Sequence, residues 1–502
     1  MSDETTQGYK FGNWLSSQPA RIAGLSIFGW GCLLVSVLLM VASFLLGRFA
    51  AGLWSLLLGL IVTVIFFVPF GSKDAGRTIV ARLYDRIGST NRTFAGGSQY
   101  RTGIFSNLPA GQLNALPGAL SNVDEIDGID GTGMPYTLLH HKSAKLLAAT
   151  MSCVPDGTDM LPQETINNQV STYGGWIAGL SRDDAIAGAT ITVDGSYSSK
   201  EPLVAKLESE QASWAPQVAL DHFNEATMLL PDKFTQTSVH ASVVWGVKNL
   251  GATVEDAVAE VASKLPTHRD LLYASGGGLP VTATSEELAK IVQIAYNPYR
   301  ATEYGTEGLL GLENPMKLSE AGPQYFDDFP GRIALHDGVA SITAQMTIPP
   351  RIHITDTTFK ELFAPQEKFL RKRVTIFYRP LGTDQAISKA EQLRRNTNVT
   401  ATSKAQQSSF DQHKVDLAKK TETDLVAGAS MTCFALMVTV TFEPNQQAYR
   451  EAKHKLQTLL GATNLGYRWV DHGASAAFHS TLPLGILPWA YQGVVDHVAE
   501  GL

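Results

Sequence analysis

Residues 22–47 (IAGLSIFGWGCLLVSVLLMVASFLLG) and residues 49–71 (FAAGLWSLLLGLIVTVIFFVPFG) are consecutive apolar runs near the start of the chain, separated by Arg48. Neither run contains a charged residue. A helix rises about 1.5 Å per residue, so each run could cross the roughly 30 Å hydrocarbon core of a bilayer. Because backbone amides must be paired in lipid, such a run has to be helical. We therefore expect a transmembrane helical hairpin over residues 21–71, after a cytosolic tail over residues 1–20.

The charges beside the hairpin predict its orientation. Residues 72–101 contain six cations and two carboxylates, an excess of 6 − 2 = +4, whereas the turn between the two runs carries only Arg48. Positive residues remain on the cytoplasmic side of a membrane. The expected location is therefore the inner (plasma) membrane, crossed twice, with both termini in the cytoplasm.

Residues 72–97 predict a basic juxtamembrane helix or linker. Arg77, Arg82 and Arg86 lie among the apolar residues Ile79, Leu83 and Ile87, which is typical of an amphipathic helix at the membrane surface, and Lys73 precedes them. We identify these four cations as candidate contacts to anionic lipid head groups. An equally good interpretation is that they are solvated and only set the topology.

Composition excludes several classes of protein. The 502-residue chain has 40 Lys+Arg against 47 Asp+Glu, a net charge of −7, and 17% charged residues, below the roughly 25% typical of soluble chains. The composition is not that of a disordered or collagenous chain. An acidic balance argues against a nucleic-acid binder overall. Cys32, Cys153 and Cys433 lie far apart and form no CxxC pair, so neither a zinc site nor a disulfide framework is indicated.

The rest of the chain predicts mixed α/β (α+β) cytosolic modules, a first over residues 98–330 and a second over residues 331–502, with no internal repeat. Apolar runs predict strands at residues 145–154, 186–193, 238–247, 374–378 and 432–442. Helical spacing predicts helices at residues 165–180, 205–228, 254–265, 285–295 and 446–460, and a long polar helical pair at residues 388–425. Ser285 is expected to cap its helix.

Motifs for nucleotide or hydrolytic chemistry are missing from the sequence. Residues 246–253 (GVKNLGAT) have the glycine spacing of a phosphate-binding loop, but Ala252 replaces the lysine that neutralises the phosphates. Residues 128–133 (GIDGTG) precede Met134 and Pro135 and are typical of a turn. There is no HExxH and no GxSxG. We therefore expect no catalytic residue, metal ligand or cofactor, and a protein that is not an enzyme.

The histidines leave one alternative open. His140 and His141 should point to opposite faces of a strand and are poor ligands for one metal. His336 precedes a predicted hairpin turn, and His472 follows the end of a strand. A membrane-anchored enzyme with a site near His336 or His472 remains an alternative.

A basic cluster leads into the apolar run VTIFYRP. Lys368, Arg371, Lys372 and Arg373 are candidate contacts to an acidic partner or to nucleic acid. The aromatic residues that follow would allow single-stranded DNA to stack, so a DNA guide is a further alternative. The simpler interpretation is a solvated entrance to a strand.

The order of several motifs resembles that of actinobacterial membrane proteins encoded in conjugation, type IV secretion-like gene clusters. These motifs follow the hairpin at residues 77–83 (RTIVARL), 136–141 (YTLLHH), 321–323 (AGP), 336–351 (HDGVASITAQMTIPPR), 371–380 (RKRVTIFYRP) and 482–485 (LPLG). The resemblance implies a two-helix inner-membrane subunit fused to a domain similar to the N-terminal domain of the conjugative secretion ATPase, with the motor domain absent.

The resemblance implies a non-enzymatic inner-membrane scaffold of a translocation machine. Its expected partners are the lipid bilayer and other secretion or conjugation subunits, including a separate ATPase; nucleic acid is possible but not favoured. A subunit of a mycobacterial-type specialised secretion system is the alternative, because such subunits also place a cytosolic domain after two spans.

Overall fold

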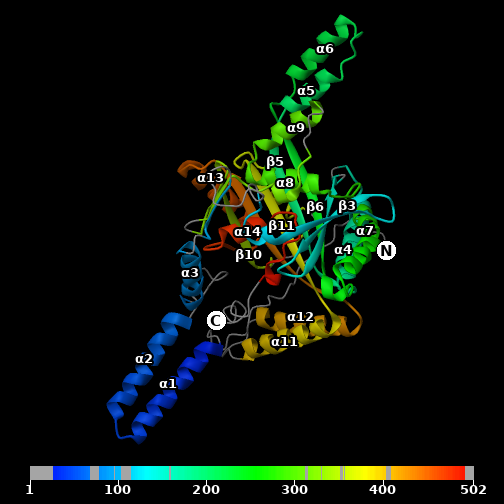
Figure 1. The fold of residues 1–502 in the computed structure, drawn as a ribbon. Helices are drawn as coiled ribbons and strands as arrows, with labels where there is room; N and C mark the ends of the chain where they lie inside the picture. The colour runs from blue at the N-terminus through cyan, green and yellow to red at the C-terminus, as the bar shows by residue number, and fades with distance from the viewer. Residues whose placement is uncertain are drawn as a thin grey trace.

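A computed structural model describes most of the chain. The described residues are 27–67, 79–94, 97–102, 115–155, 157, 160–310, 315–328, 331–350, 354–355, 357–402 and 409–491. They form a mixed α/β body around one large antiparallel sheet, from which pairs of helices project (Figure 1). The expected mixed α/β class is confirmed at this level.

The strands of the sheet follow the order β1-β8-β9-β10-β12-β11-β5-β6-β4-β3-β2, with β13 added to β10 and β7 added to β4. Their bounds are β1 Gln99–Arg101, β2 Val123–Ile129, β3 Pro135–His141, β4 Leu146–Cys153, β5 Ile186–Ser199, β6 Lys233–Gly246, β7 Val281–Thr282, β8 Tyr325–Asp327, β9 Ala334–His336, β10 Val339–Ile348, β11 Arg371–Leu381, β12 Met431–Phe442 and β13 Gly466–Trp469.

The helices cover the sheet or extend from it. Their bounds are α1 Ile27–Leu45, α2 Phe49–Phe67, α3 Ile79–Phe94, α4 Gln163–Leu180, α5 Glu201–Ser209, α6 Gln217–Met228, α7 Val254–Ala274, α8 Ser285–Tyr296, α9 Arg300–Leu310, α10 Lys360–Phe363, α11 Thr383–Thr402, α12 Ser409–Val426, α13 Gln446–Ala462 and α14 Ala474–Ser480. Short 3-10 turns lie at Gly118–Asn122, Val247–Asn249, Leu318–Glu320 and Pro488–Ala490.

The sheet consists of two halves with the same order of connections. In the first, β3 and β4 are followed by α4, β5, the pair α5–α6, β6, α7 and β7; in the second, β9 and β10 are followed by α10, β11, the pair α11–α12, β12, α13 and β13. In each half the strand after the helical pair lies between the other two long strands, as β6 lies between β5 and β4 and β12 between β11 and β10. The halves meet where β5 pairs antiparallel with β11. The two-module boundary predicted after residue 330 falls between β8 and β9, which are neighbours in this same sheet.

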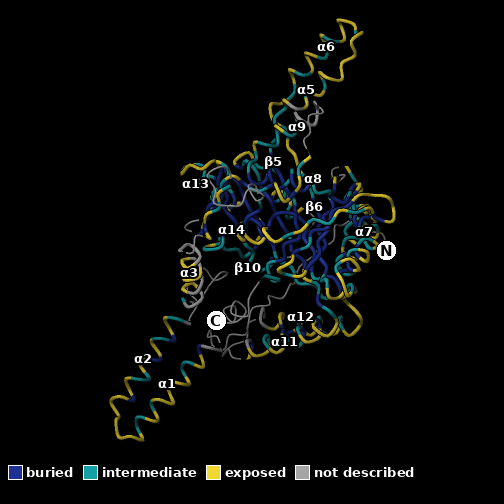
Figure 2. Tube along the Cα trace, in the orientation of Figure 1, coloured by how far each residue is buried: buried dark blue, intermediate teal, exposed yellow. Residues whose placement is uncertain are grey.

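Both faces of the sheet are covered, as the buried residues in Figure 2 show. On one face α4 and α7 cover the first half, around Trp176 and Val261, and α10 and α13 cover the second half, around Leu362 and Leu456. On the opposite face, α8, α14 and the residues that follow α14 form a third apolar cluster. The middle parts of the central strands β5, β6, β11 and β12 are therefore buried on both sides.

Two details of the predicted elements are wrong. Residues 205–228 are not one helix: α5 ends at Ser209 and α6 begins at Gln217, directly after Pro216. Proline disfavours helical geometry at the residue before it and provides no N–H, so the chain breaks there. The cap of α8 is Thr284 and not Ser285, since the Thr284 side chain accepts from the Glu287 amide in a capping box.

The other predicted strands and helices are present, although α7 continues nine residues past its predicted end at residue 265 and β5 six residues past residue 193. The helical pair predicted at residues 388–425 is α11 and α12. The expected hairpin turn after His336 is confirmed as well. Asp337 and Gly338 both have positive φ, 35° and 86°, which is the geometry of a tight two-residue hairpin.

Candidate functional site

The apolar helices α1 and α2 lie side by side at one end of the molecule (Figure 1). Gly59 faces Ser36 so closely that a Cβ atom at position 59 would lie 1.8 Å from the serine Oγ, and Ser36 and Thr63 bond their hydroxyls to their own helix backbones. Small residues and internally bonded hydroxyls are typical of helices that pack in lipid.

One segment of this pair, Phe49–Phe66 in α2, has the length and apolarity needed to cross a membrane. The apolar part of α1 described by the structure, Gly29–Leu45, is shorter, so the predicted second pass is not confirmed. Only 11% of the Phe49–Phe66 segment is buried, which distinguishes it from a core helix of the body. Its outward surface is apolar, with Trp54 and Leu58 exposed.

Two of the four predicted membrane-surface cations lie on α3, which contacts α2. Arg82 and Arg86 are exposed one turn apart, and the neighbouring Leu83 and Ile87 are exposed too. Lys73 and Arg77 lie outside the described residues. The exposed part of α3 therefore combines cations with apolar side chains, as a helix at a bilayer surface does.

The predicted basic cluster before and within β11 is not one surface patch. Lys368 is exposed and pairs with Glu451 at 2.9 Å, and Arg371 pairs with buried Asp194 of β5 at 2.8 Å. Lys372 and Arg373 are each 1% exposed. Successive side chains of a strand point to opposite faces, and both faces of β11 are covered, so these two cations are buried on opposite sides of the sheet. They are not available as a surface for nucleic acid.

Burial changes the pKa of both cations. Desolvation lowers the pKa of Lys372 to about 8, and its Nζ donates to the carbonyl of Ala364. Desolvation also lowers the pKa of Arg373 to about 10. The Arg373 guanidinium lies 4.6 Å from the centre of the Phe478 ring, a cation–π contact. Both side chains are therefore part of the protein interior.

The histidines near Arg373 are buried and engaged. His336 Nδ1 donates to the Tyr296 carbonyl at 2.5 Å, and its Nε2 accepts from the Ser341 hydroxyl at 2.8 Å. His479 lies 2.8 Å from the Tyr296 hydroxyl. Burial lowers the pKa of His336 to about 3 and that of His479 to about 4, so both rings are neutral at pH 7. The Ser341–His336 contact resembles a nucleophile and its base, but His336 is 0% and Ser341 1% exposed, so a substrate would have no access.

The two glycine motifs have structural roles. Thr253, at the end of the loop that has a phosphate-binding spacing, caps α7 by accepting from the Asp256 amide. In the GIDGTG turn, Asp130 accepts from the amides of Thr132 and Met134 and pairs with Arg269 of α7 at 2.5 Å. The carboxylate therefore fixes the β2–β3 turn on α7, as expected of a turn.

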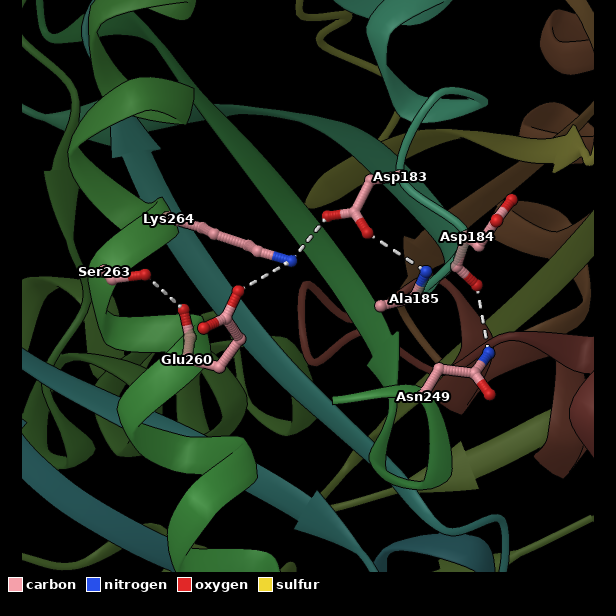
Figure 3. A network of polar contacts seen from close by, with 7 residues as sticks. All are labelled: Asp183, Asp184, Ala185, Asn249, Glu260, Ser263 and Lys264. Atoms are coloured by element: carbon pink, nitrogen blue, oxygen red, sulfur yellow. Dashed lines mark hydrogen bonds and ion pairs between the residues drawn. The ribbon is translucent and has the colours of Figure 1, made fainter. Parts of the chain in front are cut away.

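A second polar network attaches α7 to the loop before β5 (Figure 3). Lys264 pairs with Asp183 at 2.9 Å and with Glu260 at 3.3 Å, and the Asp183 carboxylate also accepts from the Ala185 amide. Burial alone would lower the pKa of Lys264, but the bonds to Asp183 and Glu260 raise it. This network is partly exposed and internally paired, which indicates a structural clamp.

The segment 474–491, which we call the C-terminal strap, connects the two halves of the sheet. Thr375 of β11 and Thr150 of β4 donate to the carbonyls of Thr481 and Pro483, at 3.2 and 2.8 Å, and His141 of β3 bonds to the Leu484 carbonyl. Gly485 has a φ of 68°, and a Cβ atom there would lie 2.4 Å from the Ala148 side chain. The strap thus follows a polar row of the sheet that sequence periodicity did not reveal.

The helical pairs inserted into the two halves differ in packing. In α11–α12, which pack against each other, several apolar side chains are buried, namely Ala386, Ala390, Leu393, Ala401, Val415 and Ala418. By contrast, α6 contains no buried residue, although α5 packs against α9. The α5–α6 arm extends from the body at the end opposite to α1 and α2 (Figure 1).

Among the described residues, no group of three or more His, Cys, Asp or Glu side chains could hold a metal ion. No family model matches the chain. Nor does any curated protein match it.

Proposed function

We propose that this protein is a membrane-anchored, non-enzymatic scaffold of a conjugation or type IV secretion-like translocation machine. The observation that carries the proposal is the outward apolar surface of α1 and α2, which extends from a body whose own core is closed. Exposed apolar surface of this size is stable when lipid covers it. The resemblance of the motif order to secretion-cluster membrane proteins supplies the kind of machine.

The proposal includes two membrane passes in the inner membrane and a cytoplasmic body. In the sequence the uncharged apolar run that contains α1 spans residues 22–47, a run of the length needed to cross a bilayer. The excess of cations after residue 71 and the exposed Arg82 and Arg86 on α3 support a cytoplasmic location for the body.

The body is suited to docking other subunits, including a separate ATPase. One sheet, clamped by the strap across both halves, makes a rigid support for the two projecting helical pairs. The buried histidines serve this support, because each is used in hydrogen bonds within the core.

Cysteine labelling in intact cells tests the anchor. The three native cysteines are replaced by serine, and Leu46→Cys is introduced in the exposed turn between α1 and α2, with Lys206→Cys on α5 as the matched control. A membrane-impermeant maleimide should label position 46 in intact cells and position 206 only after lysis. Labelling of both or of neither before lysis, or recovery of the chain in the soluble fraction, would contradict the two-pass anchor.

Purification from native membranes in mild detergent tests the scaffold role. Other secretion or conjugation subunits should co-purify with the full chain and be lost from a Leu58→Arg variant that disturbs the anchor. Repeated recovery of the chain alone would overturn the assignment to a translocation machine. ATP hydrolysis by the purified chain would overturn its non-enzymatic role.

A further inference from the structure

The outer part of the α5–α6 arm, residues 207–230, presents an apolar and acidic surface with no described cover. Its apolar side chains are among the most exposed in the molecule: Trp214 83%, Val218 68%, Met228 80% and Leu229 80%. A soluble surface usually exposes such side chains singly, whereas these four lie within one short arm.

The helix α6 cannot be stable by its own propensity. It has 12 residues, none of them buried, and isolated helices of this length are marginal in water. Its half-buried side chains, Leu220, Phe223 and Thr227, recur at intervals of three and four and occupy a different stripe from Val218. One face of α6 therefore turns toward the arm itself, and the opposite face, where Val218 lies beside Asp221 and Glu225, remains exposed.

The charges of the arm identify the chemistry of the missing cover. Residues 207–230 contain four carboxylates, Glu208, Glu210, Asp221 and Glu225, and no Lys or Arg, a local charge of −4. Asp221 accepts only a neutral amide bond from Gln217, and Glu225 lies 3.9 Å from the His222 ring, so neither is neutralised by a lysine or arginine of the described arm. Such a surface repels anionic lipid, nucleic-acid phosphates and a second copy of itself.

We propose that residues 207–230 form the docking surface for a protein partner whose contact region is an apolar groove bordered by Lys and Arg. This inference deepens the proposed scaffold role and rests on it for the idea that the partner belongs to the same machine. Because the arm lies at the opposite end of the molecule from α1 and α2, this partner is met away from the bilayer (Figure 1). Trp214 is the expected anchor, since an exposed tryptophan that enters a groove often dominates an interface.

Site-specific photo-crosslinking in native cells tests the proposal. The photo-reactive amino acid p-benzoylphenylalanine is placed at position 218 or 228 of the full chain, with position 426 as the matched control. Val426 ends α12 and is as exposed, at 83%, as the arm residues. Positions 218 and 228, but not 426, should yield an adduct with one protein, and mass spectrometry should place the crosslink in an apolar segment flanked by Lys or Arg.

Binding of the purified partner then decides the energetics. Trp214→Ala should weaken binding about 10-fold or more. The double variant Asp221→Lys, Glu225→Lys should also weaken binding, and its loss of affinity should be larger at low salt than at high salt because salt screens the charges. Both variants replace exposed residues, so their circular dichroism and thermal unfolding should match those of the native chain, whereas Val426→Ala should bind normally.

Other outcomes would overturn the proposal. These are an adduct with lipid, nucleic acid or a second copy of this chain, an adduct with a segment that lacks basic residues, no adduct above the level of position 426, or unchanged affinity for Trp214→Ala. The two proposals fail separately: an anchored chain with an unoccupied arm removes only this inference, and an occupied arm on an unanchored chain removes only the membrane scaffold.

Discussion

The helical pairs α5–α6 and α11–α12 occupy the same place in the two halves of the sheet, but they differ in how far their apolar side chains are buried. The pair α11–α12 follows β11 and precedes β12, and it hides residues such as Leu393 and Val415 within the molecule. The pair α5–α6 follows β5 and precedes β6, and it leaves Trp214 and Met228 in solvent. At the same position in the fold, the inserted pair α11–α12 therefore buries its apolar side chains, whereas the inserted pair α5–α6 projects from the body and exposes them.

A substitution in the C-terminal strap, which contacts both halves, is expected to have the largest effect on stability. Gly485→Ala should destabilise the whole sheet by about 2–5 kcal/mol, because the positive φ is unfavourable for alanine and its Cβ atom would collide with Ala148. Chemical denaturation of the detergent-solubilised chain measures the loss. Gly461→Ala, at a position in α13 with open space around it, is the control and should leave stability the same or slightly higher.

Truncating a buried residue of one pair and an exposed residue of the other sharpens the comparison. Leu393→Ala in α11 should cost about 2–4 kcal/mol, since its side chain is 7% exposed and its removal leaves a cavity. Leu229→Ala in the arm, where the side chain is 80% exposed, should change the free energy of unfolding by less than about 0.5 kcal/mol. Equal losses for the two variants would show that the arm is packed in the free chain.

Acidification should weaken both halves through their buried histidines. Burial lowers the pKa of His240 and His268 in the first half, of His336 in the second half and of His479 in the strap to about 4 or below from an ordinary 6.5. The unfolded chain then binds protons that the folded chain does not, so stability is present above pH 6.5 and falls between pH 6.5 and about 4.

At pH 5.5 the free energy of unfolding should be lower by roughly 1 kcal/mol per histidine, which denaturation across this pH range measures. His268→Asn provides a control within the first half. Its amide oxygen can accept from Trp176 as His268 Nδ1 does, so the variant should lose about one histidine's share of the pH dependence. An unchanged slope would contradict the neutral state of His268.

The smallest effect on stability is expected at the ion pair between α11 and α12. Arg394 of α11 lies 3.4 Å from Glu422 of α12, and both side chains are partly exposed. Glu422→Gln should cost less than about 0.5 kcal/mol at low salt and nothing measurable at high salt. A loss above 1 kcal/mol would show that charge, and not apolar burial, holds α11 to α12.

Local pattern revealed much of the fold but little of the pairing. The runs that became β4, β12 and the buried part of β6 were predicted closely, because burial on both faces makes them continuously apolar. The duplication of the two halves left no repeat in the sequence, because equivalent strands share their place in the sheet and not their residues. The basic cluster at β11 was wrongly predicted as a surface patch, because the sequence does not show which segments will cover the two faces of β11.

The arm was predicted as one long helix because its apolar spacing continues through residues 210–216, and only Pro216 marked the break. The burial of Arg373 and the Ser341–His336 contact could not be predicted from local sequence pattern. Their neighbours come from distant parts of the chain, such as Phe478 and Tyr296.

The sequence by itself determined the apolar helices, the positions of most of the long strands and the excess of cations after residue 71, because these depend on periodicity and charge within a single segment. The tertiary structure decided the joining of the two halves in one sheet, the burial of Lys372 and Arg373 and the exposure of the arm. Each of these depends on which distant segment lies opposite, and strand pairing and helix packing are set by contacts that no local stretch contains.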